Sequence, residues 1–131
     1  MYKEERAMVE LFRNYSRAFD SLNASRIAAL YTLPCSTSDG DGLKVFVDEE
    51  SLANKFEENC SAMKVMGYRS SEFNILSEIN MGEFVTAVNV GWRVGTEKGE
   101  IEFRSMYVCH KENDSWLIFS ANVYDGTFNA I

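Results

Sequence analysis

The order in which helix and strand patterns follow one another is the feature that most restricts the fold of this chain. Helical periodicity dominates the first half, whereas the second half consists of long strand-like runs separated by short turns. A turn-rich stretch at residues 34–42 lies between the second and third helical segments and is typical of a small hairpin. This order predicts an α+β fold in which one curved sheet wraps around a long helix, an architecture that usually encloses a pocket.

Two amphipathic segments begin the chain. Apolar side chains at helical spacing predict a first helix over residues 3–22. Asn23 is expected to cap a second, shorter helix that extends as far as Tyr31. Pro34 should close this segment, because a helix usually ends before the residue that precedes proline.

A third helix and four long strands are expected after the hairpin. Asp48 is a suitable N-terminal cap for this helix, and Gly67 is a suitable residue for its C-terminal end. The predicted strands cover residues 68–79, 84–94, 101–110 and 116–124. Long strands joined by short turns favour an antiparallel meander.

Length and composition limit the function classes. A chain of 131 residues fits a single domain, residues 1–131, and its net charge of -7 without a basic cluster argues against nucleic-acid binding. No segment has the roughly 20 apolar residues of a membrane span, and the N-terminus lacks the apolar core of a signal peptide. Three widely spaced cysteines and one histidine suggest neither a disulfide framework nor a metal site. We therefore expect a cytoplasmic protein with no cofactor, metal, nucleic-acid or membrane partner.

Several short segments carry a resemblance to a known family. They are the amphipathic first helix, residues 30–34, residues 45–50, the step at residues 67–68 and residues 116–118. With these segments the whole chain resembles the nuclear transport factor 2-like superfamily, in its SnoaL-like and ketosteroid-isomerase-like branches. The resemblance implies a cone in which three N-terminal helices pack on a strongly curved, mostly antiparallel sheet. It implies no particular chemistry, because this superfamily hosts enzymes and assembly domains alike.

Tyr15 and Asp39 are the candidate catalytic pair that the resemblance implies. In ketosteroid isomerases of this superfamily, a tyrosine on the first helix donates a hydrogen bond to the substrate oxygen, and a carboxylate from the first hairpin moves the proton. Tyr15 and Asp39 stand at a similar separation. Two departures weaken the assignment: Asp39 lies in an Asp-Gly-Asp-Gly run typical of a solvated turn, and the position of the family's second acid falls near residues 105–107, which contain no carboxylate.

Aromatic and polar side chains are the candidates for ligand binding. The predicted ligand-binding residues are Phe12, Phe19, Tyr31, Phe56, Trp92, Tyr107 and Asn122. Aromatic residues at such spacing can line a cavity or fill it, and the sequence leaves both readings open. Strict alternation also places Ser120 and Asn122 on the same face as Ile118. These polar residues either anchor a ligand or lie on the opposite face of the sheet, toward solvent or a second subunit.

Three functions of different classes follow. The leading hypothesis is that a small, largely apolar molecule binds in a pocket between the first helix, the third helix and the concave sheet. A second hypothesis is a lyase or isomerase that uses Tyr15 and a pocket acid. The third is a non-catalytic structural dimerisation domain. For all three, we expect a homodimer formed through the outer face of the sheet.

Overall fold

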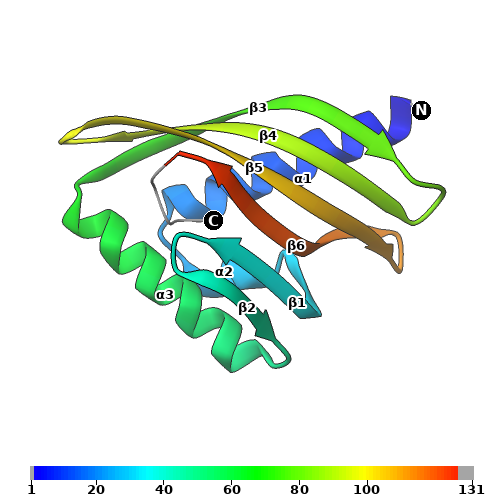
Figure 1. The fold of residues 1–131 in the computed structure, drawn as a ribbon, viewed down its shortest axis with the longest axis horizontal. Helices are drawn as coiled ribbons and strands as arrows, with labels where there is room; N and C mark the ends of the chain where they lie inside the picture. Colours follow the sequence, from blue (N-terminus) through cyan, green and yellow to red (C-terminus); the bar gives the residue numbers. More distant parts are fainter. Residues whose placement is uncertain (1, 127–131) are drawn as a thin grey trace.

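Three helices lie against one six-stranded sheet (Figure 1). The computed structural model describes the backbone of residues 2–126 and the side chains of residues 7–126. The elements are α1 (Tyr2–Asp20), α2 (Ala24–Ala28), β1 (Tyr31–Asp39), β2 (Gly42–Phe46), α3 (Glu49–Val65), β3 (Tyr68–Asn80), β4 (Val85–Thr96), β5 (Gly99–Glu112) and β6 (Ser115–Asp125). The predicted α+β class is confirmed, as is the predicted order of two helices, a hairpin, a third helix and four strands.

Local sequence signals set most of the helix ends. Asn23 accepts a hydrogen bond from the backbone N–H of Arg26 at 3.1 Å, and so caps the start of α2. Asp48 accepts from the backbone N–H of Ser51 at 2.8 Å and caps α3 in the same way. Gly67 follows α3 with φ +74°, a conformation that glycine adopts without steric cost. These three cap predictions are confirmed.

The strand order of the sheet is β2-β1-β6-β5-β4-β3. Every neighbouring pair is antiparallel except β1 and β6, which run parallel, so the sheet is mostly antiparallel as predicted. α1 packs on the inner face of the sheet, where Phe12 contacts the rings of Trp92 on β4 and Tyr107 on β5. The helices therefore close the concave side, and none of the helices within residues 2–126 covers the opposite face of the sheet (Figure 1).

The second helix is shorter than predicted, and Tyr31 begins a strand instead of ending a helix. The backbone N–H of Ile118 donates to the carbonyl of Leu30 at 2.8 Å, which ties this segment to β6. Pro34 therefore lies within β1 and not at a helix end. It occupies the part of β1 that is unpaired with β6, and pairing with β2 begins only at Cys35, so the missing N–H removes no ladder hydrogen bond.

A bulge in β6 changes which of its side chains face inward. Ile118 pairs with Cys109, but the next pair along the ladder joins Ser120 to Val108, so Phe119 is an inserted residue. Ile118 and Ala121, three positions apart, are both fully buried. The expectation that Ser120 shares a face with Ile118 is therefore wrong, because strict alternation does not hold across a bulge.

Candidate functional site

Seven aromatic side chains fill the interior of the cone. They are Phe12, Tyr15, Phe19, Tyr31, Phe56, Trp92 and Tyr107, and each is at most 5% exposed. The ring centroids of Phe12 and Tyr107 are 4.7 Å apart, and those of Tyr31 and Phe56 are 5.2 Å apart, distances at which aromatic pairs attract one another. The sequence placed all seven in the site, and the structure brings all seven together.

The polar atoms of these aromatic residues bond to one another. The phenol oxygens of Tyr15 and Tyr31 are 2.8 Å apart, and the indole N–H of Trp92 donates to the Tyr107 phenol oxygen at 2.9 Å. Burial, followed by electrostatic repulsion from neighbouring ionisable groups, raises the pKa of Tyr15 and Tyr31 well above that of an ordinary phenol. Burial also raises the pKa of Tyr107. All three phenols are therefore neutral hydrogen-bonding groups at physiological pH.

The space left between these side chains is very small. The cavity inside the cone has a volume of about 10 Å³ and is lined by Tyr15, Phe19, Met63, Tyr68, Ser71, Trp92, Val94 and Phe103. A single water molecule requires a cavity of roughly 10–15 Å³. Of the two readings that the sequence left open, the structure shows the filled cone.

Asp39 is buried, although its turn sequence suggested a solvated position. Its side chain is 1% exposed, and its Oδ2 lies 3.3 Å from Nζ of Lys55 on α3. Its other oxygen, Oδ1, accepts a hydrogen bond from the backbone N–H of Asp41 at 2.9 Å. Both carboxylate oxygens thus have partners. The phenol of Tyr15, the other half of the predicted catalytic pair, contacts the phenol of Tyr31 instead.

Lys55 is a site residue that the sequence analysis missed. It lies three positions after Leu52, on the buried face of α3, and its side chain is 6% exposed. A lysine on the apolar stripe of a helix is a signal in its own right, because a buried ammonium group requires an anionic or polar partner. The partner, Asp39, comes from a hairpin that precedes the helix and could not be identified from helical spacing.

Asn122 lies outside the cone. Its side-chain amide donates to the backbone carbonyl of Met106 at 3.1 Å and contacts the Ser120 hydroxyl at 3.4 Å. Asn122 pairs with Met106 across the ladder, one position beyond the pair of buried residues Tyr107 and Ala121. The bulge at Phe119 therefore places Asn122 on the outer face, where it cannot anchor a molecule inside the cone.

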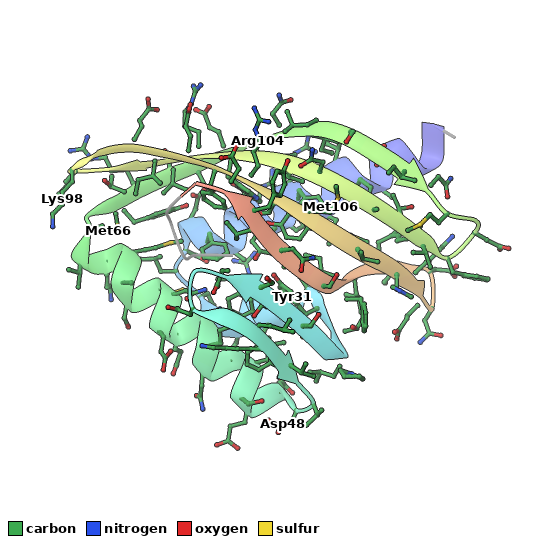
Figure 2. All side chains as sticks on the ribbon, viewed as in Figure 1. Tyr31, Asp48, Met66, Lys98, Arg104 and Met106 are labelled. Carbon is green, nitrogen blue, oxygen red and sulfur yellow. The ribbon has the colours of Figure 1, made fainter. Side chains whose placement is uncertain are left out.

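The outer face of the sheet carries a broad groove of about 510 Å³. It is lined by Glu72, Phe73, Asn74, Leu76, Gly91, Trp92, Arg93, Glu102, Phe103, Arg104 and Asp125. Gly91 forms its floor: a Cβ there would lie 3.6 Å from a methyl carbon of Leu76. Alternation along β5 puts Arg104 and Met106 on this outer face; both are labelled in Figure 2.

Charges of both signs alternate across this groove. Nε of Arg93 lies 3.2 Å from Oε1 of Glu102 and 3.9 Å from Oε2 of Glu100. Nε of Arg104 lies 3.8 Å from Oδ2 of Asp125. More than half of each of these side chains is exposed, so the pairs stabilise the monomer little and are available to other partners.

The described part of the chain has neither a cluster of metal ligands nor a helix that could cross a membrane. Among residues 7–126, no three His, Cys, Asp or Glu side chains gather in a way that could hold a metal ion. None of the helices within residues 2–126 combines the length and the apolar character that crossing a membrane requires.

The fold resembles those of several solved structures. An NTF-2-like protein of unknown function from Shewanella oneidensis is 13% identical, with a TM-score of 0.79 over 93% of this chain and 99% of that one. A ketosteroid isomerase-like protein from Erwinia carotovora atroseptica is 13% identical, with a TM-score of 0.74 over 95% and 98% of the two chains. A Xanthomonas campestris protein, described as a candidate calcium/calmodulin-dependent protein kinase II association domain, is 16% identical, with a TM-score of 0.68 over 92% and 86%.

Identities this low establish the fold alone. No curated protein matches the chain. A family assignment comes from the sequence itself, since residues 4–126 match the family described as NTF2-like protein (DUF6841). That match covers nearly the whole chain and agrees with the cone of helices and sheet; this chain belongs to the DUF6841 family of NTF2-like proteins.

Proposed function

We propose that this chain is a non-catalytic association module that pairs with a second copy of itself through the outer face of its sheet. The observation that carries the proposal is the filled cone, whose internal cavity of about 10 Å³ is too small for any ligand larger than water. With no room inside the cone, a partner has to bind on the surface. One hollow of about 600 Å³ lies beside residues 21–25 and α3, but charged and exposed apolar side chains occur together on the outer face of the sheet. The groove of about 510 Å³ lies there.

The other two functions expected from the sequence receive less support. A small apolar ligand in the cone would have to displace several buried aromatic rings, with loss of their packing energy. A lyase or isomerase that uses Tyr15 and Asp39 would need an available carboxylate. Asp39 already accepts from Lys55 and from the backbone of Asp41.

The charge pattern of the outer face suits self-association. In a two-fold symmetric dimer the same patch meets itself, so a patch that carries both signs can be complementary to its own copy. Arg93 and Arg104 lie among acidic side chains of the groove, which include Glu72, Glu102 and Asp125. After a two-fold rotation, each arginine can face a carboxylate of the second copy.

Exposed apolar side chains on the same face add the hydrophobic part of an interface. Leu76 and Phe119 are 42% and 40% exposed, and Tyr124 is 53% exposed. Tyr124 is held in place by a hydrogen bond from its phenol to Oδ1 of Asn89 at 2.7 Å. Apolar anchors among polar neighbours are typical of interfaces between subunits. The fold similarity to a candidate association domain is in keeping with this proposal.

Sedimentation velocity tests the proposal. The wild-type chain should sediment as a dimer of twice 14.9 kDa at micromolar concentration, and such an interface would bury about 800 Å² per subunit. The double variant Arg93→Glu/Arg104→Glu should sediment as a monomer, because every charged residue that lines the groove would then be acidic and the two copies would repel each other. Lys98→Glu, the same charge reversal at the exposed β4–β5 turn (Figure 2), should leave the dimer intact. A wild-type monomer at about 50 µM would refute the proposal.

A further inference from the structure

The ammonium group of Lys55 has fewer acceptors than it can use. It can donate three hydrogen bonds, yet among the described residues it meets a single acceptor, Asp39 Oδ2, at the long distance of 3.3 Å. Its other close contact is the ring of Phe56, whose centroid is 6.0 Å from Nζ. A side chain that is 6% exposed cannot obtain the missing partners freely from water.

Two neighbouring groups are also without partners. Nδ2 of Asn59 and Oγ1 of Thr37 are buried and have no hydrogen-bond partner among the described residues. Asn59 follows Lys55 by one helical turn, so their side chains lie next to each other on α3. Thr37 precedes Asp39 by two residues on β1, so its side chain points to the same inner face. Three groups that can donate hydrogen bonds thus lie on α3 and β1, the two elements that the Lys55–Asp39 ion pair joins.

We propose that Lys55, Asn59 and Thr37 form a binding site for a small carboxylate, and that Asp39 occupies this site in the ligand-free chain. Asp39 offers only one of its two oxygens, Oδ2, to Lys55. An anion that offered two oxygens could accept from more of the unused donors. A free carboxylate can turn both of its oxygens toward this cluster. Asp39 cannot, because its Oδ1 accepts from the backbone N–H of Asp41.

The hairpin that carries Asp39 is loosely attached at its tip. Along β2, residues 42–45 are exposed, and only Phe46 is buried. On β1 the buried side chains nearest the tip are those of Asp39 and Thr37, which are both polar, and the pairing of β1 with β6 ends at Ser38. A ligand carboxylate can therefore replace Asp39 if the tip, residues 39–42, moves outward. This movement breaks one ion pair and exposes little apolar surface.

Chemical rescue of an Asp39→Ala variant tests this inference. The substitution removes the carboxylate, leaves Lys55 unpaired and vacates a space of the size of a formate ion, so the melting temperature should fall. Sodium formate at 100 mM should raise the melting temperature of Asp39→Ala by at least about 3 °C relative to sodium chloride at equal ionic strength. If Asp39→Ala is unfolded in chloride, recovery of its circular dichroism spectrum in formate becomes the measurement.

Three matched variants make the result decisive. Asp39→Ala/Lys55→Met should show no difference between formate and chloride, because the cation is absent. In the Asp39→Ala background, Asn59→Leu should weaken formate binding by about three- to tenfold. Glu102→Ala is the control for an exposed ion pair, because it removes the carboxylate that pairs with Arg93. Both side chains are exposed, so formate should have no specific effect. Equal melting temperatures of Asp39→Ala in formate and chloride, or a rescue that persists without Lys55, would overturn the proposal.

Discussion

The phenol oxygens of Tyr15 and Tyr31 lie 2.8 Å apart at the centre of the cone and join α1 to the first residue of β1. Both side chains are almost completely buried, so each phenol depends on protein partners.

Removing either phenol should destabilise the protein. Tyr15→Phe and Tyr31→Phe should each lower the free energy of unfolding by about 1–2 kcal/mol, because each removes the buried hydrogen bond between the two phenols. The double variant should cost less than the sum of the two single variants, since the pair is lost only once. Urea unfolding at one fixed protein concentration measures all three. Tyr124→Phe, which removes a more exposed phenol bonded to Asn89, should cost less than about 0.5 kcal/mol.

Stability should decrease at alkaline pH because of the buried tyrosines. Burial raises the pKa of Tyr15, Tyr31, Tyr68 and Tyr107 above the value of 10.0 for an exposed phenol. A raised pKa means that the folded state holds the proton more tightly than the unfolded state does. The stabilisation is therefore complete below about pH 10 and is lost as the pH rises further.

Absorbance at 295 nm, which follows phenolate formation, checks this expectation. At pH 10.5 the folded protein should contain fewer ionised tyrosines than the same protein in 8 M urea. Equal titration curves in the two conditions would contradict the raised pKa values. Urea unfolding at pH 9 and pH 10.5 should show the corresponding loss of stability.

The three cysteines should be unreactive in the folded protein. Burial raises the pKa of the Cys35 thiol to about 11 and that of Cys109 to about 12, and it also raises the pKa of Cys60. At pH 8 a thiol of pKa 11 is about 0.1% thiolate, compared with about 10% for a thiol of pKa 9, and only the thiolate reacts. Ellman's reagent at pH 8 should label the folded chain slowly and all three thiols rapidly in denaturant. Rapid labelling of one thiol before unfolding would show that its site opens.

Gly126 should tolerate alanine less well than Gly99. Both residues have positive φ angles, +111° and +118°, so both substitutions introduce backbone strain. A Cβ at Gly126 would also lie 2.5 Å from Cβ of Phe103 and 2.9 Å from the carbonyl oxygen of Glu102, whereas a Cβ at Gly99 would meet nothing within 4 Å. Gly126→Ala should therefore lower the free energy of unfolding by about 1–3 kcal/mol more than Gly99→Ala. Equal losses in thermal unfolding would argue against this clash.

The parts of the fold that depend on neighbouring residues were predictable from the sequence. The caps at Asn23 and Asp48 each involve a backbone N–H three residues away, so the residue types reveal them. The start of β1 at Tyr31 depends instead on the backbone of Ile118, which is distant in sequence. Helical propensity extends through this segment, but the tertiary hydrogen bond decides its conformation.

For the candidate site, the sequence identified the aromatic residues but not the state of the cavity. Whether seven rings fill or line a cone depends on differences in side-chain volume of a few tens of Å³, which composition does not resolve. The ion pair of Lys55 and Asp39 joins two elements, and neither residue alone indicates the other. Turn propensity correctly predicted that the backbone turns at Asp39. It did not predict that the carboxylate of Asp39 is buried against Lys55.

The bulge at Phe119 divides β6 into two halves with opposite parity. Before it, the even-numbered Ile118 is buried; after it, the odd-numbered Ala121 is buried, and Asn122 and Tyr124 take part in hydrogen bonds of the outer face. Deletion of Phe119 would leave Ile118 opposite Cys109 and Ala121 opposite Tyr107, so both would still face inward and only the bulge would be lost. Deletion of a residue that is paired in the ladder would instead shift the register and move the side chains beyond it to the other face. Position 119 is therefore a place where β6 can change in length by one residue without reversing the faces of the strand.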